Sequence, residues 1–198
     1  MGIGFSTSVI ALALKDKGET DYEIHTVEQF DKCVKLANEL IPEELKKNIT
    51  IHKSDVEIWK TDLIPYEYFS IYKELPEQPE GGWDMILVDG SGPFLENGKF
   101  IELPNGDVMK MLLDKKIKAG TLIAWDGRLS ALKTLERYFG DNFYITLPED
   151  KSDFNVIERK DNDVKFEDVR LKMIQRMGYL KGLDDTNDGK KKVFDKAP

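Results

Sequence analysis

Met85-Ile86-Leu87-Val88-Asp89-Gly90 is a run of four apolar residues that ends in an Asp-Gly pair. The same pattern returns at Leu122-Ile123-Ala124-Trp125-Asp126-Gly127. Continuously apolar runs of this length are typical of strands that are buried on both faces of a parallel sheet. Ligands bind beyond the carboxyl ends of such strands, so Asp89 and Asp126 are the first candidate site residues.

Further strands and amphipathic helices alternate on both sides of these two runs. The expected strands are Tyr22–Val27, Ile49–Lys53, Asp84–Val88 and Thr121–Trp125. Apolar residues at helical spacing predict helices over 30–40, 108–117 and 129–139. This alternation predicts an α/β domain with a mostly parallel sheet and helices on both of its faces.

The pattern changes near the end of the chain. Asn142–Leu147 and Asp153–Arg159 are expected strands separated by five residues, too few for a helical crossover, so they must pair antiparallel. An apolar stripe from Phe166 to Leu180 predicts a final helix, and the charged residues beyond it predict a frayed tail. We expect one domain over residues 1–161, and a helix with a flexible tail over 162–198.

The composition limits the classes of function. The chain has 198 residues with 29 Lys+Arg and 37 Asp+Glu, a net charge of −8, and 40% hydrophobic residues. This acidic balance argues against unspecific nucleic-acid binding, and no apolar run is long enough for a membrane span. Cys33 is the single cysteine, which excludes an intrachain disulfide and a thiolate metal cluster. We expect a cytoplasmic protein that acts on a small molecule; its oligomeric state is left open.

The chain opens with the glycine-containing loop Met1-Gly2-Ile3-Gly4-Phe5-Ser6-Thr7. Glycines allow a backbone to approach a ligand closely, and Ser6 or Thr7 can cap the helix that follows. The next strand ends in Val27-Glu28-Gln29, where a carboxylate can accept the hydroxyl protons of a ribose. The loop and the acidic strand end together indicate a cofactor that contains a nucleoside.

Two cofactor classes share this geometry. A nicotinamide dinucleotide would favour a third glycine where Thr7 stands, and the Tyr-x-x-x-Lys pair of short-chain dehydrogenases is absent. S-adenosylmethionine carries no pyrophosphate and does not need the third glycine. An NAD-linked oxidoreductase on a related fold is the alternative to the S-adenosylmethionine interpretation.

The order of these motifs resembles that of class I S-adenosylmethionine-dependent methyltransferases. The matching stretches, within about residues 1–160, are 2–7, 26–29, 83–90 and 119–126. The resemblance implies a Rossmann-like three-layer sandwich with a mostly parallel sheet and a C-terminal antiparallel hairpin. It also implies methyl transfer to a small-molecule or sugar-like acceptor, at an oxygen atom. The family's first strand would precede Met1, so we expect a chain that lacks this strand and is unstable or weakly active.

The resemblance also implies the roles of individual residues. The glycine loop would hold the methionine part of the cofactor through Gly2, Gly4, Ser6 and Thr7. Glu28 would bind the ribose hydroxyls, Gln29 would belong to the same cofactor site, and Asp55 would lie near the adenine. Asp89 would lie near the transferred methyl group, and Asp89 and Asp126 are the candidate catalytic residues.

A divalent metal ion is conceivable at Asp89 and Asp126 but is not favoured. Metal-dependent O-methyltransferases of the family place a further Asp or Asn beside the second aspartate, whereas Gly127 and Arg128 follow here. A guanidinium opposes a hard cation, which also needs several oxygen ligands. Each aspartate could instead cap a turn, and the chain could then be a truncated, non-catalytic binding module.

Two further sets of residues are interpreted as structural. His25 and His52, the only histidines, fall inside expected strands and not at their carboxyl ends, so we do not favour either as a catalytic base. Tyr68, Phe69 and Tyr72 could line an acceptor pocket or form a lid, but we expect them to pack a crossover helix against the sheet.

Overall fold

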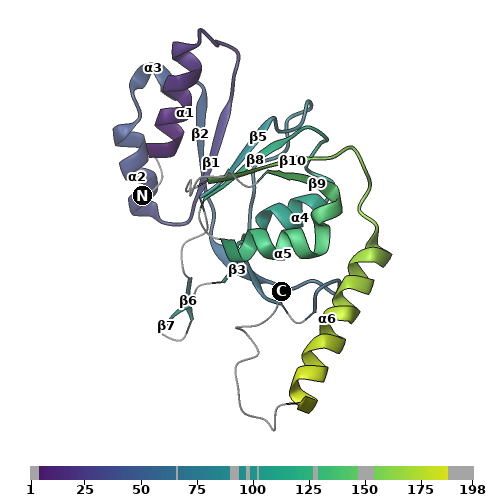
Figure 1. Ribbon diagram of the computed structural model, residues 1–198. Helices are drawn as coiled ribbons and strands as arrows, with labels where there is room; N and C mark the ends of the chain where they lie inside the picture. The colour runs from purple at the N-terminus through teal and green to yellow at the C-terminus, as the bar shows by residue number, and fades with distance from the viewer. Residues whose placement is uncertain are drawn as a thin grey trace. The chain divides into compact units, whose positions relative to one another are not determined.

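The chain folds into two compact units. Their helices and strands are labelled in Figure 1. The computed structural model describes residues 5–65, 67–89, 94–96, 99–101, 103–126, 129–146 and 154–186. The first unit comprises Met1–Trp59, Phe69–Trp83 and Asp89–Lys116. The second unit comprises Lys60–Tyr68, Asp84–Val88 and Ile117–Pro198.

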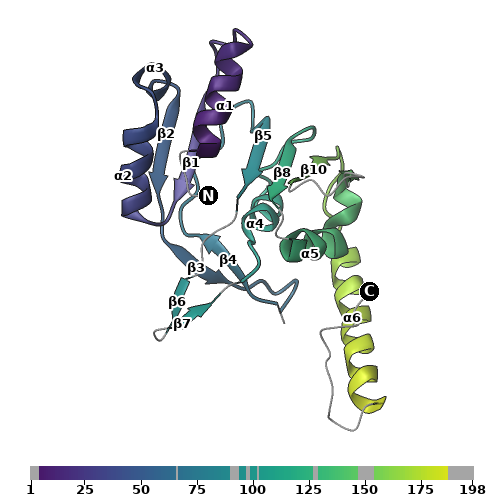
Figure 2. The same ribbon diagram turned by 60° about the vertical axis from the view of Figure 1, so that its left-hand side comes forward.

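The first unit begins with alternating helices and strands. These elements are α1 (Phe5–Asp16), β1 (Ile24–Glu28), α2 (Asp31–Leu40), α3 (Glu43–Lys46) and β2 (Ile49–Lys53). β1 and β2 lie side by side and pair in parallel (Figure 2). In this pairing Ile24 lies opposite Ile49. Side chains alternate between the two faces of each strand, which turns Ile24, Ile49 and Ile51 toward the helices. There they pack against a buried cluster formed by Ala11, Ala37, Ile41 and Leu45.

The first unit also contains two antiparallel strand pairs and a helix. These elements are β3 (Val56–Trp59), β4 (Phe69–Tyr72), β6 (Phe94–Glu96), β7 (Lys99–Ile101) and α4 (Asp107–Leu113). β3 pairs with β4, and β6 pairs with β7. The prediction of a crossover helix at Tyr68, Phe69 and Tyr72 is therefore wrong. Aromatic and β-branched residues favour strands, and the sequence Phe69-Ser70-Ile71-Tyr72 follows this preference.

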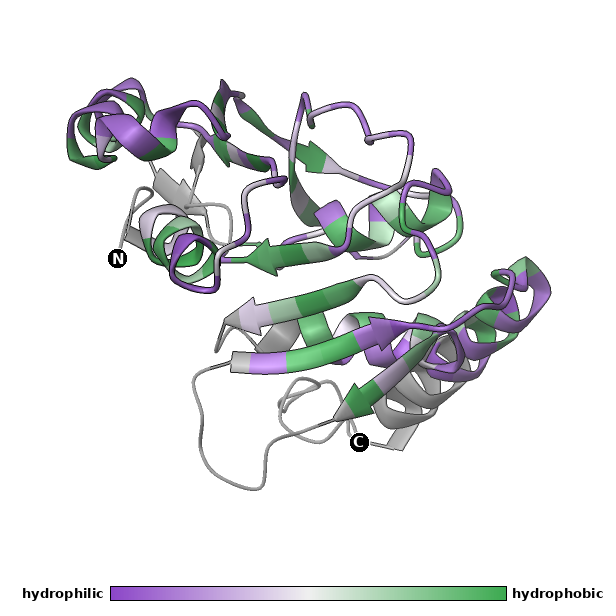
Figure 3. Cartoon of the chain, turned by 90° about the horizontal axis from the view of Figure 1, so that it is seen from above, coloured by the Kyte–Doolittle hydropathy of each residue, from purple (hydrophilic) through white to green (hydrophobic). Residues whose placement is uncertain are grey.

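The second unit contains a four-stranded sheet and two longer helices. Its elements are β5 (Met85–Val88), β8 (Leu122–Asp126), α5 (Leu129–Phe139), the short 3-10 helix η1 (Gly140–Asn142), β9 (Phe143–Thr146), β10 (Phe154–Arg159) and α6 (Phe166–Thr186). The strand order is β5-β8-β10-β9. Much of these strands is hydrophobic, drawn green in Figure 3. Their most deeply buried side chains are Ile123, Trp125, Phe143 and Ile157. None of the described helices, α6 included, is both long and apolar enough to cross a membrane.

The predicted Rossmann-like sandwich around one mostly parallel sheet is wrong. The described strands form separate sheets: the parallel pair β1-β2, the antiparallel pairs β3-β4 and β6-β7, and the mixed four-stranded sheet. In that mixed sheet only β5 and β8 run parallel, whereas β10 is antiparallel to both of its neighbours. The expected antiparallel pairing of the last two strands is present, as β9 and β10. Local periodicity predicted most of the strands, but it carries no information on which strands share hydrogen bonds.

Candidate functional site

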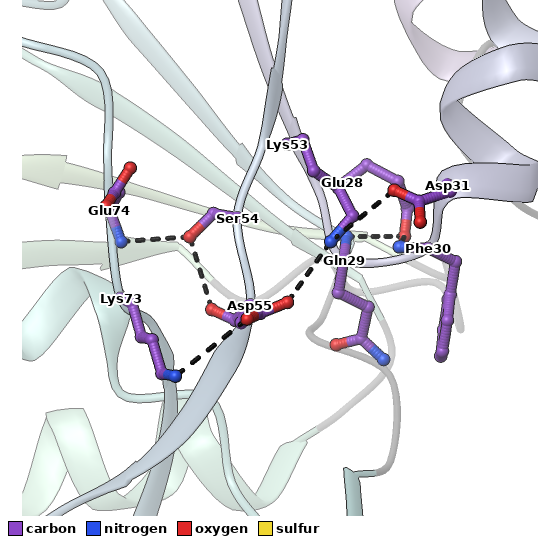
Figure 4. Close-up of polar contacts among 9 residues, drawn as sticks. All are labelled: Glu28, Gln29, Phe30, Asp31, Lys53, Ser54, Asp55, Lys73 and Glu74. Atoms are coloured by element: carbon purple, nitrogen blue, oxygen red, sulfur yellow. Dashed lines mark hydrogen bonds and ion pairs between the residues drawn. The ribbon is translucent and has the colours of Figure 1, made fainter.

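Glu28 ends β1, and its carboxylate builds the turn that leads into α2. Oε1 accepts hydrogen bonds from the backbone N–H groups of Gln29 at 2.7 Å and Phe30 at 2.8 Å (Figure 4). The carbonyl of Phe30 then accepts the first helical bonds, from Cys33 and Val34. Among the described residues no further hydrogen bond to this carboxylate is found. One oxygen of Glu28 therefore shapes the loop, and Oε2 can bind a ligand.

The first turn of α1 is tied to β1 and to Asp89. The hydroxyls of Thr7 and Thr26 lie 2.9 Å apart, and Thr26 precedes Glu28 by two residues in the same strand. The Ser6 hydroxyl donates a hydrogen bond of 3.3 Å to Oδ2 of Asp89, which belongs to the first unit. The structure therefore brings Ser6 to Asp89, and Thr7 to Thr26 in the strand that ends in Glu28. Gly2 and Gly4 lie outside the described residues.

Lys53, the last residue of β2, lies opposite Glu28 in the parallel register. Its Nζ lies 3.2 Å from Oδ1 of Asp55 and 3.8 Å from Oδ1 of Asp31 (Figure 4). These ion pairs are exposed, so each stabilises the fold by less than about 1 kcal/mol. Sequence reasoning missed Lys53, because its position beside Glu28 follows from the strand register alone.

Asp55 follows β2 and lies within a cluster of charged side chains. Its carboxylate is paired with Lys53 and, at 3.9 Å, with Lys73. The buried hydroxyl of Ser54 donates to the carbonyl of Asp55 and accepts a hydrogen bond of 2.9 Å from the backbone N–H of Glu74. Ser54 thus joins the end of β2 to residues 73–74. The adenine contact of Asp55 stays a prediction, and any such contact would compete with the two lysines.

An open hollow of about 490 Å³ lies at the carboxyl end of β2. Its walls are formed by Ile51, His52, Lys53, Glu74, Leu75, Pro76 and Glu77. Small-molecule sites have volumes of roughly 300–1,000 Å³ and combine apolar walls with a few polar groups. The hollow lies within this range of volume, but it is open to solvent and its lining is more polar than apolar. Through Lys53 it adjoins the strand position opposite Glu28.

The second candidate catalytic residue, Asp126, belongs to the second unit. It ends β8, opposite Phe154 of β10, and its side chain lies outside the part of the chain that the structure describes. Arg128 lies outside the described residues as well. Within the described ranges, no group of three or more His, Cys, Asp or Glu side chains is placed to hold a metal ion.

No model of a protein family matches the sequence, and no curated protein is similar enough to count as a relative.

Proposed function

We propose that the first unit binds S-adenosylmethionine at the carboxyl end of β1, and that the chain transfers the methyl group to a small-molecule acceptor. The observation that carries this proposal is the pair of contacts that tie the first turn of α1 to Asp89 and to the strand that ends in Glu28. Ser6 donates to Asp89, and the Thr7–Thr26 contact holds the same turn of α1 against the strand that ends in Glu28. A hydroxyl, a carboxylate and a second carboxylate at a strand end suit a cofactor with a cationic group and a ribose.

The side chains would divide the binding between them. Oε2 of Glu28 would accept hydrogen bonds from the ribose hydroxyls, while Oε1 continues to accept the two backbone hydrogen bonds of the turn into α2. The carboxylate of Asp89, oriented by Ser6, would attract the positive charge of the cofactor. The apolar wall of the hollow beside Lys53 would take a planar base. Bound S-adenosylmethionine supplies an activated methyl group on a positively charged sulfur.

The acceptor class is a small molecule with a hydroxyl group. Methyl transfer is an in-line displacement, so holding the acceptor oxygen in line with the methyl group provides much of the acceleration. The net charge of −8 opposes the approach of nucleic acid, which supports a small acceptor. We place the reaction in the cytoplasm, since the single cysteine fits a reducing compartment.

Calorimetric titration of S-adenosylhomocysteine tests the cofactor class. We expect micromolar binding to the wild type, and binding at least roughly tenfold weaker to Glu28→Gln, because the amide loses the charge and one acceptor for the ribose diol. The amide oxygen still accepts the bonds from Gln29 and Phe30, so the thermal unfolding of this variant should stay close to that of the wild type. Glu39→Gln, an exposed glutamate of α2, is the matched control.

The other outcomes of this titration overturn the proposal. Tighter binding of NAD than of S-adenosylhomocysteine would favour an NAD-linked oxidoreductase. Absence of binding by either compound to a chain with a cooperative unfolding transition would favour a non-catalytic binding module. Equal binding of S-adenosylhomocysteine to the wild type and to Glu28→Gln would show that Glu28 is not part of the site.

A further inference from the structure

The two histidines of the chain lie side by side on neighbouring strands. His25 of β1 lies opposite Thr50, and His52 of β2 lies opposite Val27. The two imidazoles are therefore diagonal neighbours on one face of the strand pair, and Ile24, Ile49 and Ile51 lie on the other face. Nδ1 of His25 and Nε2 of His52 are 2.9 Å apart. Their ring planes differ by only 17°. The edge of Trp83 contacts His25 with 5.3 Å between the ring centroids.

This geometry fits a shared proton and not a shared metal ion. Two nitrogens that hold one metal ion direct their lone pairs toward a third point, and the bonds to the metal are about 2.0–2.1 Å long. Here nearly coplanar rings bring one nitrogen of each to hydrogen-bond distance from the other. One of these nitrogens must donate its N–H and the other must accept it.

Glu23 selects the direction of this hydrogen bond. Its Oε2 lies 3.4 Å from Nε2 of His25, and its side chain is 79% exposed to solvent. A carboxylate accepts hydrogen bonds, so the Glu23 contact favours the His25 tautomer that carries its proton on Nε2. Nδ1 of His25 then accepts the hydrogen bond that Nε2 of His52 donates. In this tautomer Nδ1 of His52 carries no proton and can act as a base.

We propose that Glu23, His25 and His52 form a proton relay that holds one shared proton and presents His52 as a neutral base at the hollow beyond β2. A ligand hydroxyl or ammonium in the hollow would give its proton to Nδ1 of His52. The Nε2 proton of His52 then passes to Nδ1 of His25, and the Nε2 proton of His25 passes to Glu23 and on to water. Each imidazole ends with one proton, so the chain of transfers balances. This proposal stands on the His25–His52 geometry and does not depend on the identity of the cofactor.

The charges around the pair agree with a single shared proton. Burial lowers the pKa of the His52 imidazole below its ordinary value, and the charge of His25 lowers this pKa further. At the hollow, Lys53 opposes a positive charge on His52, whereas Glu74 and Glu77 favour one.

Nitrogen-15 NMR of the imidazoles tests the relay directly, because the chain contains only two histidines. We expect both neutral rings to carry their proton on Nε2. We also expect the pair to take up its two further protons in two separate steps. In His25→Asn, whose amide can replace Nδ1, His52 should titrate in a single step at higher pH than the second step of the wild type. Glu23→Gln should move the first step to lower pH, whereas the exposed control Glu19→Gln should not.

Carbethoxylation by diethyl pyrocarbonate tests access to the base, because this reagent attacks an unprotonated imidazole nitrogen. Mass spectrometry should locate the first modification on His52 and not on His25. Faster modification of His25 would overturn the proposal, as would absence of reaction at both rings. A neutral His25 protonated on Nδ1, or a His52 titration unchanged in His25→Asn, would overturn it as well.

Discussion

The carboxylate of Asp107 accepts a hydrogen bond of 2.9 Å from the backbone N–H of Tyr72, which joins the first turn of α4 to the end of β4. Asn105 donates a second bond, of 2.7 Å, to its other oxygen. Burial nevertheless raises the pKa of Asp107 to about 6, against the opposing effects of Asn105, Tyr72 and Lys110. The folded state therefore binds a proton at Asp107 more tightly than the unfolded state does.

This raised pKa predicts how Asp107 changes the stability of the first unit with pH. Its contribution is fully present below the ordinary pKa of 3.8 and is lost as the pH rises through about 6. In Asp107→Asn the side chain no longer titrates. We expect the difference in unfolding free energy, wild type minus variant, to fall by roughly 3 kcal/mol between pH 3.5 and pH 7. Urea unfolding across this range measures it, and a constant difference would contradict the assignment.

Gly106 precedes Asp107 and is required for close packing. A Cβ at this position would lie 2.7 Å from Cβ of Phe69 and 3.1 Å from Cγ2 of Ile71. The φ of −105° suits any residue, so the constraint is steric and not conformational. We predict that Gly106→Ala lowers the unfolding free energy by about 1–3 kcal/mol, through overpacking against β4. Gly81→Ala, whose Cβ would meet nothing within 4 Å, is the control; equal loss in both variants would contradict the prediction.

Local periodicity made much of the secondary structure predictable. The expected strand Ile49–Lys53 and the expected helix over 129–139 match β2 and α5. The prediction missed β4, because the aromatic residues Tyr68, Phe69 and Tyr72 also fit helical spacing, and it missed β3, the strand that pairs with β4. Strand pairing could not be predicted, since it depends on hydrogen bonds between segments far apart in sequence.

The candidate site shows the same division between local and non-local information. Glu28 could be predicted because it ends a strand, and strand ends are visible in the sequence. Lys53, and the contact between His25 and His52, could not be predicted. Both depend on the parallel register that sets His25 opposite Thr50 and Glu28 opposite Lys53. Ser6 and Asp89 were predicted separately, but their hydrogen bond became visible only in the structure.

Glu67 connects two helices of the second unit. Its Oε1 accepts a hydrogen bond of 3.0 Å from the phenol of Tyr138, in α5. The same oxygen lies 3.6 Å from Nη1 of Arg137 and 3.6 Å from Nε of Arg176, which belongs to α6. Burial, and secondarily Glu67, raise the pKa of Tyr138 to about 12, so the phenol keeps its proton and can donate at any physiological pH.

Removal of the charge on Glu67 should destabilise this unit. Glu67→Gln keeps an acceptor for Tyr138 but leaves Arg137 and Arg176 without their carboxylate, and we expect a loss of about 1–3 kcal/mol in unfolding free energy. Urea unfolding measures the loss. Glu136→Gln, an exposed glutamate of α5, should change stability by less than about 0.5 kcal/mol. A Glu67→Gln variant as stable as this control would show that the ion pairs contribute nothing.

The charge of Asp89 should affect the affinity for the proposed cofactor more than the affinity for its demethylated product. S-adenosylmethionine has a positively charged sulfur, and S-adenosylhomocysteine has a neutral one. Asp89→Asn keeps an oxygen that accepts the Ser6 hydrogen bond but removes the negative charge. We predict that the variant binds S-adenosylmethionine roughly tenfold more weakly and S-adenosylhomocysteine less than about threefold more weakly, because only the cation loses a Coulombic partner. Calorimetric titration with both ligands measures the two ratios, with the exposed Asp21→Asn as control. Equal weakening of both ligands would assign Asp89 a purely structural role, and unchanged affinity for both would place the sulfur away from Asp89.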